Sequence, residues 1–166
     1  MKRAFVVHAE GARIDESRDA NLLARFAAAA LGLSHSIRRD ALFGVSFGER
    51  VLWMRGDRIR QWRPDGGSAT GIMRKALAGG KHPGVWLGEL EEAEALVPYA
   101  EKRVFVFENQ RELPALRAPI IAHTALHGGG LAVENALPAA FPRTTFPDQA
   151  IAVANILLDR ERSWRS

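Results

Sequence analysis

Hydrophobic and polar positions along the first half of the chain follow the patterns of short strands and amphipathic helices. Residues 2–9 form a β-branched and aromatic run, which predicts an opening strand. Residues 21–33 repeat apolar side chains at helical spacing, and Asp19 is placed to cap that helix. Residues 41–47 alternate as a strand does, and VLWMRG and DRIRQW predict two further short strands joined by a turn.

The second half continues this alternation. Ser68 is placed to cap a helix over ATGIMRKAL, and a short strand is predicted at residues 84–88. An acidic-faced helix (ELEEAEALVPYA) and two strands (KRVFVFEN and PIIAH) follow, and LAVENALPAAF has helical character up to Pro138. The last element is a long helix with Pro147 in its first turn. Because strands and helices alternate over residues 1–166, we expect a single α/β domain with a mainly parallel sheet flanked by helices.

Composition narrows the class of protein. With 166 residues, 47% of them apolar and 25% charged, the chain has the balance of a globular protein that buries a core. The absence of cysteine excludes disulfide scaffolds, zinc ribbons and thiol catalysts, and it favours a cytoplasmic location. The five histidines show no metal-ligand spacing, so we expect no metal site. No apolar run is long enough for a signal peptide or a membrane span, so we expect no membrane association.

The net charge is +4, and arginine dominates its positive side. Arginine suits phosphate groups and planar bases, because its guanidinium donates hydrogen bonds in a fixed fork. Basic residues recur in short stretches, partly beside Trp53 and Trp62, at Arg38, Arg39, Arg55, Arg58, Arg60, Arg63, Arg74 and Lys75. A solvated surface explains any single one of these charges, whereas the whole pattern favours a polyanionic partner.

Three further features carry residues capable of chemistry. The glycines of HGGG, residues 127–130, allow backbone N–H groups to converge on an anion, but no Walker lysine or G-x-S-x-G elbow accompanies them, which favours a flexible connection. Asp148 lies near the start of the terminal helix, where a carboxylate either complements the helix dipole or acts as a base or orienting group. His8 ends the first strand, at an edge where α/β folds bind ligands, although a single histidine there is more often structural.

The stretch LSHSIRRD, residues 33–40, gathers basic, hydroxyl and carboxylate side chains at the end of a helix. His35 lies close in sequence to Arg38, Arg39 and Asp40. Two adjacent arginines cannot share one helix face, so we expect at least one of them to be committed to a carboxylate or a bound phosphate. The stretch is therefore either a solvated helix end or the edge of an anion-binding site.

Three stretches together resemble one protein family. LARFAAAALGLSHSIRRD, SATGIMRKAL with HPGVW, and RVFVFEN with FPDQAIAVANILLDRE follow the order and spacing of the SPOUT methyltransferases that act on pseudouridine in the T-loop of archaeal tRNA. The first stretch is similar to the family ending L-S-H-G-I-R-R-D and departs from it only at Ser36. The others are similar at R-K-A-L, at P-G-V and at a closing L-D-R. The resemblance spans most of the chain.

This resemblance implies an α/β knot, in which the C-terminal segment threads a trefoil, and a homodimer with its site at the subunit interface. It implies S-adenosylmethionine as the cofactor and transfer of a methyl group to N1 of pseudouridine in tRNA, a step that needs help with the loss of the N1 proton. The implied catalytic residues are Asp148, Arg38 and Asp40. Asp148 would position the target base, Arg38 would hold a tRNA phosphate, and the Asp40 carboxylate would orient one of the two adjacent arginines. The implied RNA-binding residues are Arg25, His35, Arg38, Arg39, Arg74 and Lys75, and the implied cofactor-binding residues are Phe107, Glu108, Asn109, Thr144, Thr145, Phe146 and Ala150.

The chain departs from the family at the cofactor pocket. Residues 107–110 stand where the family has an L-G-D-H-like turn, so that Glu108 replaces a glycine that permits close backbone approach. Ala150 stands where the family often has a cysteine. Three interpretations remain open. The chain is a tRNA methyltransferase with an altered pocket, a homologue that binds RNA or another ligand without methyl transfer, or a structural or regulatory dimer that binds neither S-adenosylmethionine nor RNA.

Overall fold

The chain folds into alternating strands and helices, largely at the positions that the hydrophobic pattern predicts. The computed structural model describes residues 1–63, 65–97, 103–108, 119–127, 131, 133, 137–140 and 147–163. The strands are β1 (Arg3–His8), β2 (Ala41–Phe47), β3 (Arg50–Arg55), β4 (Val85–Gly88), β5 (Arg103–Glu108), β6 (Ile120–Ala125) and β7 (Leu137–Ala140). The helices are α1 (Ser17–Leu31), α2 (Gly66–Leu77), α3 (Glu92–Leu96) and α4 (Pro147–Ser163).

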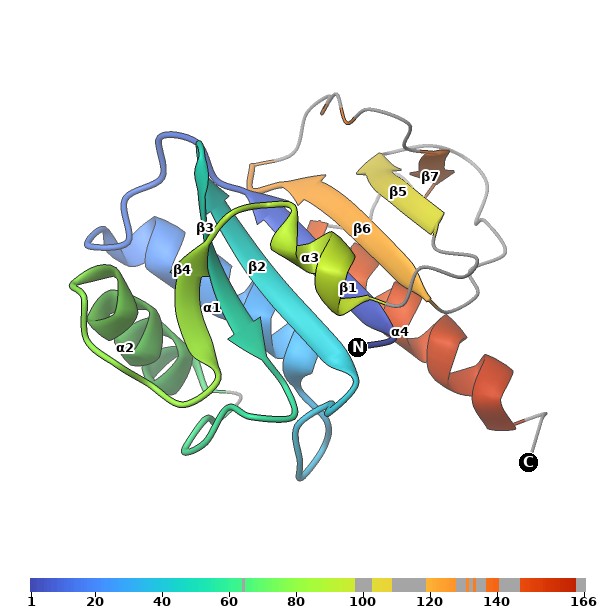
Figure 1. The fold of residues 1–166 in the computed structure, drawn as a ribbon, viewed down its shortest axis with the longest axis horizontal. Helices are drawn as coiled ribbons and strands as arrows, with labels where there is room; N and C mark the ends of the chain where they lie inside the picture. The colour runs from blue at the N-terminus through green and yellow to red at the C-terminus, as the bar shows by residue number, and fades with distance from the viewer. Residues whose placement is uncertain are drawn as a thin grey trace.

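The described strands form one seven-stranded sheet in the order β4-β3-β2-β1-β6-β5-β7 (Figure 1). β1 pairs in parallel with β2 and β6, and β5 pairs in parallel with β6 and β7. β3 runs antiparallel to both of its neighbours, β2 and β4. The prediction of an α/β fold is therefore confirmed. The sheet itself is mixed, because the β2-β3-β4 meander adds two antiparallel pairings to a parallel centre.

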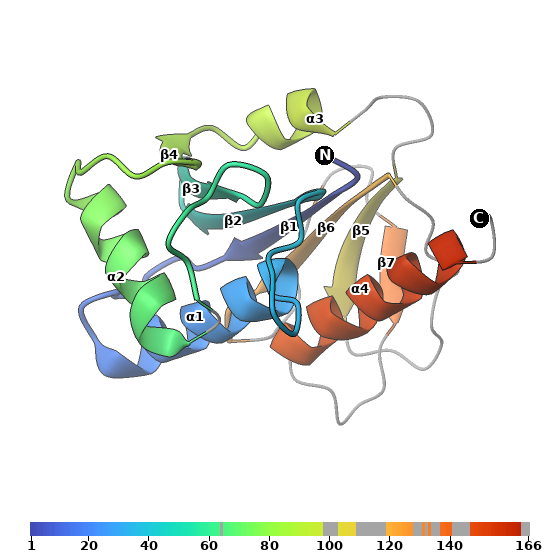
Figure 2. The ribbon, with the colours of Figure 1, turned by 90° about the horizontal axis from the view of Figure 1, so that it is seen from below.

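Helices cover both faces of the sheet. α1, α2 and α4 lie along one face, and the short α3 lies on the other (Figure 2). β1 supplies both cores, since its side chains alternate between faces. Phe5 and Val7 pack in the large core beneath α1, α2 and α4, whereas Ala4 and Val6 pack with Ala93 of α3. A strand that is apolar on both faces is typical of the centre of a parallel sheet.

Two segments differ from the structure that their pattern predicts. DRIRQW, predicted as a strand, follows β3 as a turn and irregular backbone, and Gln61 within it has a positive φ of 54°. LAVENALPAAF, predicted as helical up to Pro138, ends in β7, because residues 137–140 pair with β5. β7 is an edge strand, where Pro138 is tolerated because its missing N–H interrupts no central ladder.

Both predicted helix caps are wrong. α1 begins at Ser17, and Asp19 lies inside its first turn, where the carboxylate accepts a hydrogen bond from the Arg13 backbone N–H at 3.0 Å. The cap of α2 is Asp65, whose carboxylate accepts the backbone N–H of Ser68 at 2.6 Å. Pro147 begins α4 as predicted.

The strand directions define two edges of the sheet. The carboxyl ends of the five strands that pair in parallel meet at one edge, here called the carboxyl edge. The opposite, amino edge holds the amino ends of β1 and β2 and therefore the segment 33–40 that leads into β2. The path between β5 and α4, where a trefoil knot would thread, falls partly outside the described residues. Among the described residues, no helix has the length and apolar character needed to cross a membrane.

Candidate functional site

The two adjacent arginines of LSHSIRRD have different surroundings. The backbone N–H of Arg38 donates to the carbonyl of Leu31 at 2.8 Å, which anchors the segment to the end of α1. The Arg38 side chain is only 11% exposed and forms an ion pair with Asp159 of α4 at 2.5 Å. Arg39 is exposed. The prediction that one of the two is committed to a carboxylate is confirmed.

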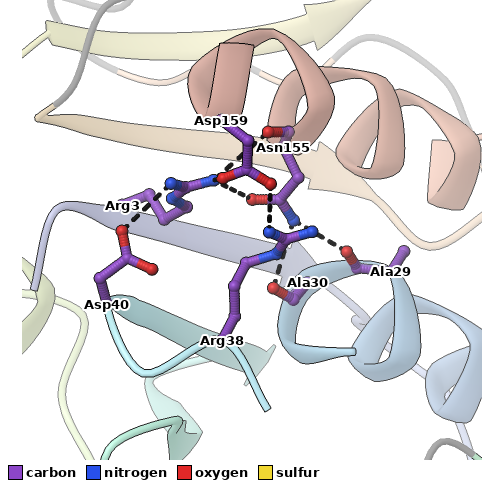
Figure 3. Close-up of polar contacts among 7 residues, drawn as sticks. All are labelled: Arg3, Ala29, Ala30, Arg38, Asp40, Asn155 and Asp159. Atoms are coloured by element: carbon purple, nitrogen blue, oxygen red, sulfur yellow. Dashed lines mark hydrogen bonds and ion pairs between the residues drawn. The ribbon is translucent and has the colours of Figure 1, made fainter. Parts of the chain in front are cut away.

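Arg38 belongs to a group of five side chains that we call the charge cluster: Arg3, Arg38, Asp40, Asn155 and Asp159 (Figure 3). Arg3, at the amino end of β1, is completely buried. Its guanidinium pairs with Asp40 at 3.1 Å and with Asp159 at 2.9 Å, and it donates to Oδ1 of Asn155 at 2.8 Å. Two cations therefore face two carboxylates, and the cluster ties α4 to β1 and to the segment 33–40.

Asn155 extends the charge cluster to α1. Its side-chain amide donates to the carbonyls of Ala29 and Ala30, at 2.8 and 3.2 Å, in the last turn of the helix. Carbonyls in a last helical turn have no partner within the helix, so this amide satisfies groups that burial would otherwise leave unpaired. Burial lowers the pKa of Arg38, and the carboxylate of Asp159 opposes that effect, so the guanidinium stays charged. Arg38 thus holds the terminal helix in place.

Beside this segment, a depression of about 990 Å³ opens at the amino edge. We call it the arginine pocket, because Arg39, Arg58, Arg60 and Arg63 line it together with His35. Within the described residues, none of the four guanidinium groups has an ion pair or a hydrogen bond. Four cations without a partner in the described part of the chain raise the local positive potential, which attracts a polyanion.

An acidic residue in the arginine pocket does not cancel this charge. Asp57 accepts two hydrogen bonds from the Arg55 guanidinium, at 2.7 and 3.0 Å. This bidentate pair neutralises the carboxylate. The remaining charge of the lining is therefore positive.

The loop that carries Arg58, Arg60 and Arg63 is fixed from its inner side. Ile59 and Trp62 are each only 6% exposed and pack in the large core. Gly84 has a positive φ and packs so closely that a Cβ there would come within 2.5 Å of the Ile59 nitrogen. The left-handed backbone of Gln61 costs on the order of 1 kcal/mol, which this packing must offset. The three arginines are therefore presented by a preorganised loop.

Most of the other implied RNA-binding residues lie outside the arginine pocket. Arg74 and Lys75 are exposed on α2, where Arg74 Nε donates to the carbonyl of Ile14 at 3.0 Å. Arg25 forms an ion pair with Asp148 at 2.8 Å. Of the six implied residues, His35 and Arg39 line the pocket.

A second group of polar residues includes Asp148, in the first turn of α4. The residue is 8% exposed, and one carboxylate oxygen pairs with Arg25. The other oxygen, Oδ1, is buried and has no hydrogen-bond partner in the described part of the chain. A buried carboxylate oxygen of this kind is costly unless a donor reaches it, so it fits a ligand that carries O–H or N–H groups.

Two histidines pair near the carboxyl ends of β1 and β6. Nε2 of His8 lies 3.0 Å from Nδ1 of His123, within hydrogen-bond distance. Burial lowers the pKa of His123 to about 4, and burial also lowers the pKa of His8, against the opposing charge of Glu10. Both rings are therefore neutral near pH 7, and one ring N–H donates to the other. His8 thus has a structural partner that the sequence pattern did not indicate.

The implied cofactor residues are only partly described. Phe107 and Glu108 end β5 at the carboxyl edge, where they pair with β7, and Ala150 is buried in α4. Asn109, Thr144, Thr145 and Phe146 lie outside the described residues.

The three implied catalytic residues do not meet within one chain. Arg38 contacts Asp159, which follows Asp148 by three helical turns along α4, or about 16 Å at 1.5 Å per residue. Asp40 pairs with Arg3 at the same amino edge. A single copy therefore separates the residues at the amino edge from Asp148.

The sequence alone does not indicate several residues of these groups. Arg3 stands inside an apolar strand and gives no signal that it is buried and paired. Arg58, Arg60 and Arg63 do belong to a basic stretch, but that stretch resembles a strand and only the fold brings it to Arg39. His123 is separated from His8 by 115 residues.

Among the described residues, no three side chains of His, Cys, Asp or Glu are arranged to hold a metal ion. No family model matches the sequence, and no curated protein matches it.

Proposed function

We propose that the protein binds structured RNA through the arginine pocket and acts in the cytoplasm as an S-adenosylmethionine-dependent RNA methyltransferase of the SPOUT type, with pseudouridine in tRNA as the target. The observation that carries this proposal is the arginine pocket. Its four guanidinium groups, which have no ion pair within the described residues, and His35 line a depression large enough for a phosphate backbone with its sugars. Phosphate contacts of this kind supply most of the affinity of proteins for nucleic acid.

The residues of LSHSIRRD support the proposal in different ways. Arg39 and His35 face the arginine pocket, where they contact phosphate or sugar. Arg38 and Asp40 act as positioning residues, because both belong to the charge cluster that holds α4 against the sheet. α4 carries Asp148, so the cluster also sets the place of the proposed base-positioning carboxylate.

The carboxyl edge is the proposed location of the methyl donor, whose sulfonium would supply the methyl group. Oδ1 of Asp148, which is buried and has no hydrogen-bond partner among the described residues, fits a ligand with hydroxyl or ammonium donors, and S-adenosylmethionine has both. Arg25 forms an ion pair with the other oxygen of the Asp148 carboxylate, which fixes the orientation of this side chain. A C-terminal trefoil knot is part of this proposal, because the resemblance implies that the chain around this edge is knotted.

A homodimer would resolve the separation between the two groups of residues. Within one chain, the arginine pocket lies at the amino edge and Asp148 lies at the start of α4. If two copies associate so that the amino edge of one faces the carboxyl edge of the other, RNA held by one copy reaches the donor held by the other. We therefore expect an obligate dimer for activity.

The test combines RNA binding and methyl transfer. An unmodified tRNA transcript carrying pseudouridine is titrated at several salt concentrations, and transfer is followed with radiolabelled donor. Arg39→Gln and Arg60→Gln are each expected to weaken binding and to reduce the slope of log K against log salt by roughly 0.7–0.9. Arg18→Gln is the matched control, since Arg18 is exposed on α1 and does not line the arginine pocket. Unchanged affinity in both pocket variants overturns the RNA site.

The second candidate is a homologue that binds RNA without methyl transfer. It is favoured by Glu108, which stands at the end of β5 where the family has a glycine. Calorimetry separates the two candidates: binding of S-adenosylmethionine near one per chain supports the methyltransferase. Absence of binding at millimolar donor, with the tRNA affinity retained, supports the alternative.

A further inference from the structure

We infer that the protein has a subsite for an unstacked RNA base next to the arginine pocket. This inference rests on the proposed RNA binding and adds to it a second, chemically different contact. The subsite is a depression of about 470 Å³ between β4 and α3, which we call the Trp86 depression. Its lining consists of Arg55, Arg58, Gly84, Val85, Trp86, Glu92, Ala95 and Leu96.

The Trp86 depression adjoins the arginine pocket. Arg58 and Gly84 line both depressions. Gly84 makes this junction possible, because its positive φ and missing side chain let the start of β4 pack against the backbone of Arg58 and Ile59. An RNA phosphate held by Arg58 would therefore have its own base, or the next base, within reach of Trp86.

The chemistry of the lining favours a base over a phosphate. Val85, Ala95 and Leu96 offer apolar surface, and the indole of Trp86 is half-buried. The carboxylate of Glu92 also lines the depression, and an acidic side chain disfavours a phosphate beside it. Flat apolar surface beside a cationic groove is the arrangement by which proteins bind single-stranded nucleic acid, with bases stacked on aromatic rings.

The indole is held in a fixed orientation. Trp86 Nε1 donates to one oxygen of Glu92 at 2.6 Å, and the other oxygen accepts the backbone N–H of Glu89 at 3.0 Å. The ring also packs near Trp53, with the two ring centroids 6.5 Å apart. A preorganised ring loses little conformational freedom when a base stacks on it. The carboxylate of Glu92, fixed by these two donors, gives the depression a preference for bases that present N–H groups.

The test compares two probes with the same backbone charge: a short oligouridylate, and a strand of equal length that lacks bases. Ala95→Met fills the Trp86 depression from an exposed position on α3, and Trp86→Leu removes the ring. Each variant is expected to lose about 10-fold in affinity for the oligouridylate, as loss of one stacked base predicts, with no change for the base-free strand. Ala78→Met, at an exposed position after α2, is the control for an added methionine.

The outcomes separate this subsite from the proposed function. Wild-type affinity of Ala95→Met and Trp86→Leu for the oligouridylate overturns the subsite, even if both strands bind in a salt-dependent way. If neither strand binds the wild-type protein, the RNA proposal fails and the subsite fails with it. A thermal melt of each variant shows whether the fold is intact, and Ala95→Met is the decisive variant because its position is exposed.

Discussion

Replacing Arg3 by methionine tests whether the charge cluster holds the terminal helix in place. Arg3 is completely buried, whereas the side chains of its partners Asp40 and Asp159 are 22% and 40% exposed. Methionine keeps most of the apolar stem and removes the cation, which leaves two carboxylates with less compensation. Removing one partner of a buried ion pair costs about 3–5 kcal/mol, and water can reach both carboxylates, so we expect a loss of about 3 kcal/mol in the free energy of unfolding.

The informative comparison is between the stability lost in Arg3→Met and the stability lost when its partner Asp40 is replaced. In Asp40→Asn, Arg3 keeps its ion pair with Asp159 and its hydrogen bond to Asn155. The amide oxygen of asparagine can still accept a hydrogen bond from Arg3, so we expect a loss of only about 1 kcal/mol. The double variant Arg3→Met/Asp40→Asn should lose less than the sum of the two, because the second change removes a carboxylate that the first left uncompensated.

Urea unfolding followed by circular dichroism measures all three free energies. In a thermal melt, a loss of about 3 kcal/mol corresponds to a decrease in Tm of about 6–12 °C for a chain of this size. If Arg3→Met loses less than about 1 kcal/mol, or loses less than Asp40→Asn, the charge cluster does not secure α4. The positioning role proposed for Arg38 and Asp40 would then have no physical basis.

Three further predictions concern the pH dependence and the local packing of the fold. Burial lowers the pKa of His123 from 6.5 to about 4, so the unfolded chain binds more protons than the folded one between pH 4 and pH 6.5. The free energy of unfolding should therefore fall by about 2 kcal/mol from pH 7 to pH 5. A smaller fall in His123→Gln would confirm that His123 causes it, and an equal fall would contradict this. Gly44→Ala should lose about 1–3 kcal/mol in urea unfolding, since a Cβ there overlaps the fully buried ring of Trp53; an unchanged midpoint contradicts this. Asp65→Ala should lose about 1 kcal/mol and Asp65→Asn almost nothing, because the asparagine oxygen still caps α2; equal losses would exclude the cap as the cause.

Local patterns predict most of the strands and helices because each of these elements has its own hydrophobic period. The failures have local physical causes. DRIRQW has the apolar spacing of a strand, but Ile59 and Trp62 are buried from a loop with a left-handed residue between Arg60 and Trp62. Such a conformation depends on what packs behind the loop, here Gly84, and that contact is invisible in the sequence.

The candidate site is less predictable than the fold for a related reason. His35 and Arg39 could be selected because they lie together in one unusual stretch. The three arginines that complete the pocket come from another part of the chain and become neighbours of Arg39 only through the β2-β3 pairing. Because Arg38 and Arg39 are adjacent, the sequence predicts that their side chains have different surroundings. It does not predict that the carboxylate partner of Arg38 is Asp159.

The position of Arg3 also has a consequence for the order of folding. Arg3 lies in the strand at the centre of the sheet, yet its hydrogen-bond partner Asn155 is separated from it by 152 residues. During synthesis, β1 can pair with β2 early, but its other neighbour, β6, and the helix that supplies Asn155 and Asp159 emerge much later. Contacts this distant in sequence slow folding, because a long loop must close before they form. A nascent chain that lacks α4 can form the Arg3–Asp40 ion pair but not the contacts of Arg3 with Asn155 and Asp159, and we expect it to reach the native packing only after the last helix has been made.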